Sequence, residues 1–274
     1  MAEPAQSARP TRVALFVTCL GDVFYPEAGE ATVRVLRRLG VEVDFPPAQT
    51  CCGQPAFNSG FRAEARSVAQ HQLEVLAPYD YVVVPSGSCT AMFRVFYPEL
   101  FAGEPELEAR ASALAERTYE LSEFLVRVLG VDDVGTTYDG KIAYHASCHL
   151  LRELGVDEPP HRLLQGVRGA EVTPMDLEAQ CCGFGGTFAV KYPDISDAML
   201  KKKIESLKRA GADTLVSCDA GCLMHIAGRL HRQGEAIRVM HLAELLDTPA
   251  TDNASRRDGS PGESGGNTSG ASGN

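Results

Sequence analysis

The chain has 274 residues, 44% of them hydrophobic, and a formal net charge of −10. This length suits one large domain or two small ones, and the acidic balance argues against nucleic acid or an anionic membrane surface as the main partner. No run approaches the 18 apolar residues of a membrane-spanning helix, and the amino terminus lacks the apolar segment of a signal peptide. We therefore expect a cytoplasmic protein, with any membrane association peripheral and through partners.

The first half of the chain alternates between predicted strands and helices. Residues 13–20, "VALFVTCL", are a continuous apolar run, which is typical of a strand buried on both faces. The next segment, 26–40, has apolar residues near helical spacing and Gly40 as a stop signal. A strand at 41–46, a helix over about 61–77 and a strand at 81–86 follow.

The second half shows the same order of elements. Strands are expected at 141–147, 170–176 and 214–217, and helices near 160–166 and over about 194–210. Alternating strands and helices predict an α/β fold with two pseudo-repeated, Rossmann-like parallel-sheet domains. We expect domains at 11–102 and 141–249, a connector at 103–140 with a helix over 106–130, and a disordered Gly/Ser-rich tail at 250–274.

The chain contains nine cysteines. An odd number of cysteines in a cytoplasmic setting does not suit a disulfide framework, so metal binding or redox chemistry is the leading explanation. The plainer alternative is that the cysteines are small core residues. It explains one or two of them, but it does not explain two Cys-Cys-Gly triplets that each contain a pair of adjacent cysteines.

The cysteines also reveal an internal repeat. Cys19, Cys51, Cys52 and Cys89 recur as Cys148, Cys181, Cys182 and Cys222, at offsets of 129, 130, 130 and 133 residues. Every set falls at a strand end or before a helix, the edge of a parallel sheet where ligands bind. Helix N-termini there favour thiolates. The spacing differs from the short C-x-x-C hairpins of zinc fingers and favours an iron–sulfur cluster, with reversible thiol chemistry and a structural metal site as alternatives.

The pattern C-x31-CC-G…C, given twice, resembles the cysteine-rich "CCG" domain family, which includes subunits of heterodisulfide reductase, glycolate oxidase and anaerobic glycerol-3-phosphate dehydrogenase. The segments "CCGQPAFNSG", "VVVPSGSC", "YHASCHLLRELG" and "CCGFGGTF" are most similar to the lactate utilization protein A branch of that family, over essentially all of 12–246.

This resemblance implies an iron–sulfur subunit of a complex that oxidises L-lactate to pyruvate without NAD. The implied partners are a ferredoxin-type iron–sulfur subunit and a third small subunit, with a small 2-hydroxy acid as candidate substrate. The implied cofactor is one or two clusters of the [4Fe–4S] type. The alternatives are a thiol/disulfide reductase that uses the Cys-Cys pairs, or a related glycolate or heterodisulfide oxidoreductase. The chain lacks the ferredoxin run C-x2-C-x2-C-x3-C-P, so its electrons must pass to or from another protein.

The chain departs from the family motif at one position in each half. The motif ends in C-x-x-C, and its first cysteine is replaced here by Ser86 and by Asp219. Four thiolates remain in each half, and these eight residues are the expected metal ligands: Cys19, Cys51, Cys52, Cys89, Cys148, Cys181, Cys182 and Cys222. Cys218, which aligns with Pro85, is a further candidate for cofactor binding.

Two histidines flank Cys148 and are the candidate catalytic residues. His145 and His149 could accept a proton from a hydroxy acid, or they could hydrogen-bond the turn and the cluster sulfurs. The three lysines 201–203 are expected on an exposed helix face.

Overall fold

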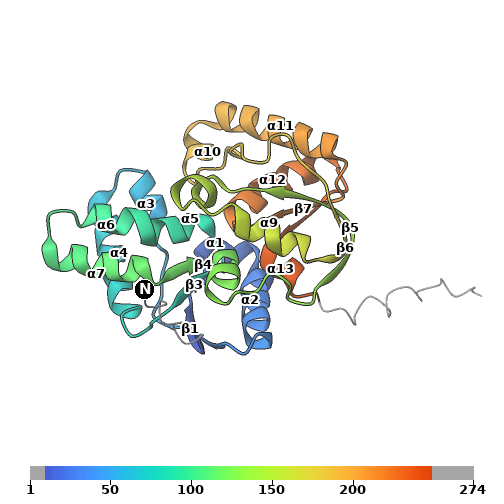
Figure 1. Ribbon diagram of the computed structural model, residues 1–274. Coiled ribbons are helices and arrows are strands. Elements are labelled where there is room, and N and C mark those ends of the chain that lie inside the picture. The colour runs from blue at the N-terminus through green and yellow to red at the C-terminus, as the bar shows by residue number, and fades with distance from the viewer. Residues whose placement is uncertain (1–9, 249–274) are drawn as a thin grey trace, which may run out of the picture.

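The computed structural model describes residues 10–248, so the tail predicted to be disordered, 250–274, lies outside the described residues. The described chain forms two four-stranded sheets, each flanked by helices (Figure 1). Every strand pairing in both sheets is parallel. The predicted α/β fold with two repeated parallel-sheet units is confirmed. None of the helices in residues 10–248 combines the length and apolar character needed to cross a membrane.

The first sheet has the strand order β2-β1-β3-β4. Its strands are β1 (Arg12–Leu15), β2 (Glu42–Asp44), β3 (Val82–Val84) and β4 (Thr118–Glu120). The helices around it are α1 (Cys19–Phe24), α2 (Pro26–Arg38), α3 (Gln54–Asn58), α4 (Arg62–Val75), α5 (Gly87–Ala91), α6 (Tyr97–Leu100), α7 (Pro105–Glu116) and α8 (Leu121–Glu123), with π-helical turns η1 (Met92–Phe96) and η2 (Phe124–Val128).

The second sheet repeats this topology with the order β6-β5-β7-β8. Its strands are β5 (Thr137–His145), β6 (Arg168–Val172), β7 (Thr214–Ser217) and β8 (Arg238–His241). Its helices are α9 (Glu158–Gln165), α10 (Phe188–Lys191), α11 (Pro193–Ala210), α12 (Ala220–Gln233) and α13 (Leu242–Leu246), with the π-helical turn η3 (His149–Glu153). In both sheets the central strand pair lies where the chain reverses direction along the sheet, the usual ligand-binding position.

The segment between the repeats differs from the sequence-based expectation. The single helix expected over 106–130 is interrupted by β4, whose Thr118 pairs with Val82 of β3. Long-range pairing with a buried strand outweighs the local helical pattern here. The fourth strand of each sheet, β4 and β8, is not predicted from the sequence, because polar residues interrupt both strands and each runs directly into a helix.

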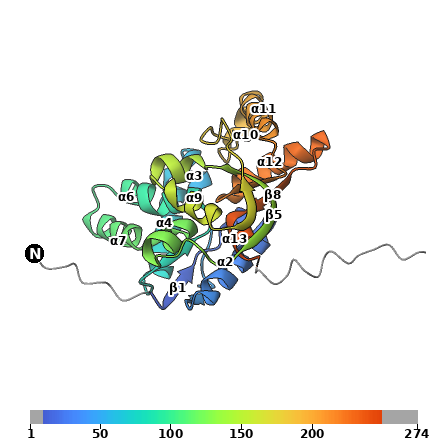
Figure 2. The same cartoon turned by 45° about the vertical axis from the view of Figure 1, so that its right-hand side comes forward.

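The two halves share one hydrophobic core between them. Its side chains come from both sheets and from α2, α8, α9 and α13, whereas two further cores belong to one half each. Helices of each half pack against helices of the other half. Helix α2 of the first half packs against α13 of the second, and α9 of the second half packs against α8 of the first. Figures 1 and 2 both show α2 beside α13. The two repeats are therefore held in a fixed relation to each other by burial of apolar side chains.

Candidate metal centre

Each cysteine of the repeat is presented at the carboxyl edge of its sheet. In the first half Cys19 begins α1 directly after β1, and Cys89 lies in the first turn of α5 after β3. Thr18 caps α1 by accepting a hydrogen bond from the amide of Gly21 at 3.1 Å, and Ser86 caps α5 by accepting one from the Cys89 amide at 3.3 Å. Since the strands are parallel, these helix N-termini meet at one edge of the sheet.

The eight expected ligands from both halves line a single cavity of about 210 Å³. The structure thus brings together all eight residues that the repeat singles out: Cys19, Cys51, Cys52, Cys89, Cys148, Cys181, Cys182 and Cys222. Their burial differs: Cys19 is exposed, whereas the second cysteine of each pair, Cys52 and Cys182, is buried. The cavity lies between the two halves, so neither half forms it alone.

The thiols within each half form a continuous chain of contacts. The Sγ of Cys19 lies 3.7 Å from that of Cys51, and the Sγ of Cys52 lies 3.3 Å from that of Cys89. Hydrogen bonds from Cys19 and Cys52 lower the pKa of Cys51 well below its usual range. The second half repeats this pattern.

In that half, hydrogen bonds from Cys148 and Cys182 lower the pKa of Cys181. These hydrogen bonds favour the thiolate form of the first cysteine of each pair, which is the form that binds metals.

The glycine after each cysteine pair has a left-handed backbone, with φ of +87° at Gly53 and +90° at Gly183. The space around the two differs. A Cβ built at Gly183 would lie 2.7 Å from the carbonyl oxygen of Ser196, whereas one at Gly53 would lie 3.3 Å from the side chain of Val68. The close approach of α11 therefore requires glycine at 183 for its lack of a side chain as well as for its backbone conformation.

Alanine substitution should separate these two requirements. Gly53→Ala is expected to cost about 1–2 kcal/mol of unfolding free energy from backbone strain alone. Gly183→Ala should cost on the order of 2 kcal/mol more, because the new methyl group meets backbone atoms of α11. Urea denaturation of both variants measures the difference, and equal costs would contradict the contact with Ser196.

The two residues that replace motif cysteines hydrogen-bond to each other across the halves. Ser86 Oγ donates to Asp219 Oδ2 at 3.1 Å, and the amide of Ser88 donates to the same oxygen at 2.9 Å. The other oxygen of Asp219 accepts a hydrogen bond from the amide of Gly221 at 3.1 Å and caps α12. Both side chains are buried. Asp219 thus joins the two repeats and fixes the helix that carries Cys222.

Cys218 lies apart from the other eight cysteines. It is fully buried in the shared core and is not among the residues lining the cavity, and its Sγ lies 3.5 Å from the hydroxyl of Tyr144. Burial raises the pKa of its thiol well above the usual value. These surroundings are those of a packed core cysteine rather than of a reactive thiol.

The two candidate catalytic histidines occupy different environments. His149 lines the cavity, with its Nδ1 3.8 Å from the Sγ of Cys148. His145 ends β5, is fully buried and does not line the cavity. Burial and the nearby Lys203 lower its pKa to about 3, so its ring is neutral. A base that accepts a proton from a bound substrate must reach it, and only His149 has that access.

Lys203 is a residue whose place the sequence analysis assigned wrongly. It was expected on an exposed face but is fully buried, and its ammonium donates to the carbonyl oxygens of Leu177 and Glu178. Burial lowers its pKa to about 8. Helical spacing contained the signal, because position 203 lies three residues after the buried Leu200 and directly before the buried Ile204.

The donor set fits an iron–sulfur cofactor. Two groups of four thiols converge on one cavity, each with a thiolate already favoured, and backbone amides near the sulfurs offer hydrogen bonds. Soft thiolate ligands select zinc, copper(I) or iron–sulfur clusters over hard cations. An adjacent cysteine pair is better placed to serve different corners of a multi-iron cluster than one small ion.

The profile of the cysteine-rich CCG domain matches residues 13–94 and 142–227, once in each half. The chain is 53% identical over 237 residues to lactate utilization protein A of Geobacillus sp. strain WCH70, a match covering 86% of this chain and 99% of that protein. It is 54% identical over 236 residues to the protein of that name from Geobacillus kaustophilus strain HTA426, with 86% and 98% covered. The chain belongs to the lactate utilization protein A family. The resemblance inferred from the cysteine motifs is confirmed.

A solved structure of a hypothetical protein from Helicobacter pylori has the same fold. Its TM-score against this chain is 0.62 at 11% sequence identity, with 87% of this chain and 49% of that chain covered. This chain therefore spans about half the length of that protein. At this identity the similarity supports the family's α/β architecture and carries no information on chemistry.

Proposed function

We propose that this chain is the iron–sulfur-binding subunit of a system that oxidises L-lactate to pyruvate. The observation that carries the proposal is the convergence of eight cysteines, four from each repeat, on one cavity of about 210 Å³. The curated relatives bear the name lactate utilization protein A and match over nearly their whole length. Thiolate clusters provide redox chemistry, and the relatives' name supplies the substrate.

The proposed division of labour follows from electron counting. Oxidation of lactate to pyruvate releases two electrons and two protons, and an iron–sulfur cluster carries electrons one at a time. Two clusters, one per repeat, would hold one electron each before passing them to a partner. The proposed partners are a subunit with ferredoxin-type clusters and a third small subunit of the same system.

A small 2-hydroxy acid is the candidate ligand of the cavity itself. His149 lines the cavity beside Cys148 and is the group in this chain best placed to accept the hydroxyl proton. The same cavity chemistry would serve glycolate or a disulfide substrate, and the name of the relatives favours lactate.

Iron and acid-labile sulfide analysis tests the proposal directly. Protein purified without oxygen is expected to contain about eight of each per chain, because two [4Fe–4S] clusters hold four of each. About four of each would mean that one repeat lacks a cluster. A folded protein that supports lactate oxidation with its partners yet contains neither would refute iron–sulfur binding.

The thiol/disulfide alternative rests on the Cys52–Cys89 contact of 3.3 Å, since neighbouring thiols can form a disulfide. This alternative requires no iron. It predicts that the metal-free chain loses two titratable thiols in the half-reaction that forms the disulfide and regains them in the other half-reaction, whereas the iron–sulfur proposal predicts that the metal-free chain is inactive.

A further inference from the structure

The two repeats differ at the position three residues before the first cysteine. In the first half this is Phe16, which packs edge-on against Phe93 with ring centroids 4.8 Å apart. In the second half it is His145, at the end of β5. Both side chains are fully buried, so one repeat places an apolar ring behind its thiols and the other places an imidazole there.

Hydrogen bonding fixes which nitrogen of His145 carries the proton. Its Nδ1 lies 3.3 Å from the carbonyl oxygen of Glu178. A carbonyl oxygen only accepts hydrogen bonds, so Nδ1 is the protonated nitrogen of the neutral ring. The Nε2 atom then carries a free lone pair, and it has no hydrogen-bond partner among the described residues although it is buried.

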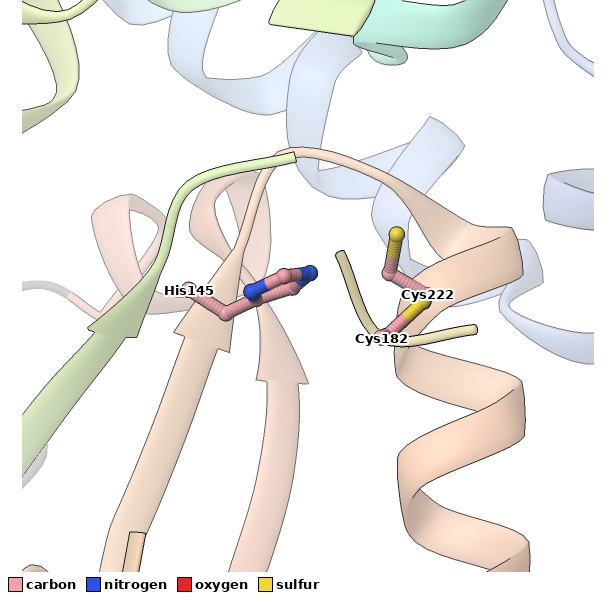
Figure 3. Close-up of side chains that lie close together, drawn as sticks. All are labelled: His145, Cys182 and Cys222. Carbon is pink, nitrogen blue, oxygen red and sulfur yellow. The ribbon is translucent and has the colours of Figure 1, made fainter. Parts of the chain in front are cut away.

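The free nitrogen faces two thiols of the second repeat. A ring nitrogen of His145 and the Sγ atoms of Cys182 and Cys222 all lie within 4.8 Å of one another. Figure 3 shows the imidazole reaching from the end of its strand, with the outer nitrogen directed toward the two cysteines. Metal-ligating histidines characteristically donate their other N–H to a backbone carbonyl or carboxylate, as His145 does to Glu178.

A buried acceptor with no partner costs about 1–3 kcal/mol, so the position of Nε2 calls for a partner that occupies its lone pair. Asp219, the nearby residue in place of a motif cysteine, is already engaged by three donors from Ser86, Ser88 and Gly221. The Asp219 carboxylate is used in the contact between the repeats. The imidazole of His145 is therefore the side chain beside Cys182 and Cys222, other than a thiol, that is free to bind a metal.

We propose that His145 Nε2 is a metal ligand of the centre held by the second repeat, which makes that centre a mixed cysteine–histidine site while the first is bound by thiolates alone. This inference rests on the proposed iron–sulfur function and adds a ligand to it. Three of the four thiols Cys148, Cys181, Cys182 and Cys222 supply the remaining donors, so the imidazole takes the place of one thiolate.

Histidine ligation gives the two centres different reduction potentials. A neutral imidazole in place of a thiolate leaves less negative charge on a cluster, and histidine ligation raises cluster potentials in Rieske-type sites. The buried ammonium of Lys203 on α11 acts in the same direction, because its positive charge interacts with the thiols of the second repeat. The matching buried position of α4 is the neutral Gln72. Electrons are therefore expected to reside on the second centre.

Pulsed electron paramagnetic resonance on the anaerobically purified, reduced chain tests the assignment. The expected result is a strong hyperfine coupling from one directly bound imidazole nitrogen, confirmed by its change in a sample carrying 15N-labelled histidine. His145→Phe, which introduces the residue of the first repeat, should abolish this coupling. It should also lower the reduction potential of the second centre by about 59 mV or more, which corresponds to a tenfold change in the equilibrium constant of a one-electron couple.

His149→Phe is the matched control, because this neighbouring histidine lines the cavity 3.8 Å from Cys148. The coupling should persist in that variant. Absence of the coupling in the unsubstituted protein overturns the inference whether or not His145→Phe folds, and so does its survival in His145→Phe. Iron and sulfide analysis of the same samples separates the two proposals: clusters without imidazole coupling refute the ligand alone, and absence of clusters refutes both.

Discussion

Cys182→Ser is expected to remove one of two iron–sulfur centres and leave the other in place. Cys182 is buried and contacts both Cys181 and Cys222, so it lies in the middle of the thiol chain of its repeat. A serine hydroxyl is a hard, weakly acidic donor that replaces a soft thiolate poorly. Iron and sulfide should fall from about eight to about four of each per chain.

Two further variants test this result, one as an equivalent change and one as a control. Cys52→Ser makes the equivalent change in the first repeat, where Cys52 contacts Cys51 and Cys89, and should cause the same loss. Cys218→Ser changes an equally buried cysteine that does not line the cavity, and it should leave the iron content at the level of the unsubstituted chain. Unchanged iron in Cys182→Ser, or loss of iron in Cys218→Ser, would show that the ligand set is wrong.

Asp219→Ala is expected to destabilise the folded chain by about 3 kcal/mol. The substitution removes the cap of α12 and leaves the Ser88 amide without its acceptor, and the Ser86 hydroxyl keeps only Ser88 Oγ as an acceptor. Loss of a helix cap costs about 1 kcal/mol and an unsatisfied buried polar group about 1–3 kcal/mol. Urea denaturation of the metal-free chain gives the free energy of unfolding.

Ser86→Ala is the matched comparison for Asp219→Ala. It removes one donor to Asp219 and the cap of α5, while the Ser88 amide and the Gly221 amide keep their acceptor. Its cost should be about 1–2 kcal/mol, with the iron content retained. If Ser86→Ala abolished a cluster at unchanged stability, then the serine would be a metal ligand and the structural role of the pair would be disproved.

The contact between Ser86 and Asp219 explains how the chain uses the positions at which it departs from the motif. Each residue caps the helix that carries a cysteine of its own repeat, α5 or α12. Their mutual hydrogen bond then fixes these two helices relative to each other across the cavity. The orientation of Cys89 and Cys222 therefore depends on a polar contact between the repeats as well as on each sheet.

Much of the fold follows from local pattern. The apolar runs at β1, β3 and β7, the helical spacing of α2, α4 and α11, and the recurrence of the cysteines at nearly constant offsets predict two α/β repeats with thiols at the sheet edge. These features are readable because burial on both faces of a parallel strand and on one face of a helix leaves a periodic signature. The edge strands β4 and β8 leave no such signature, because polar residues interrupt both of them and neither is buried along its whole length.

By itself the sequence determined the eight cysteines, their duplication and their place at strand ends, because the chemistry of thiols and the geometry of parallel strands are local properties. Only the tertiary structure decided how the two sets meet in one cavity, that Ser86 contacts Asp219, that Lys203 is buried and that His145 turns a free nitrogen toward two thiols. Each of these depends on segments far apart in the chain. The shared core of α2, α13, α8 and α9 brings the segments of the two halves together, and no local pattern encodes that packing.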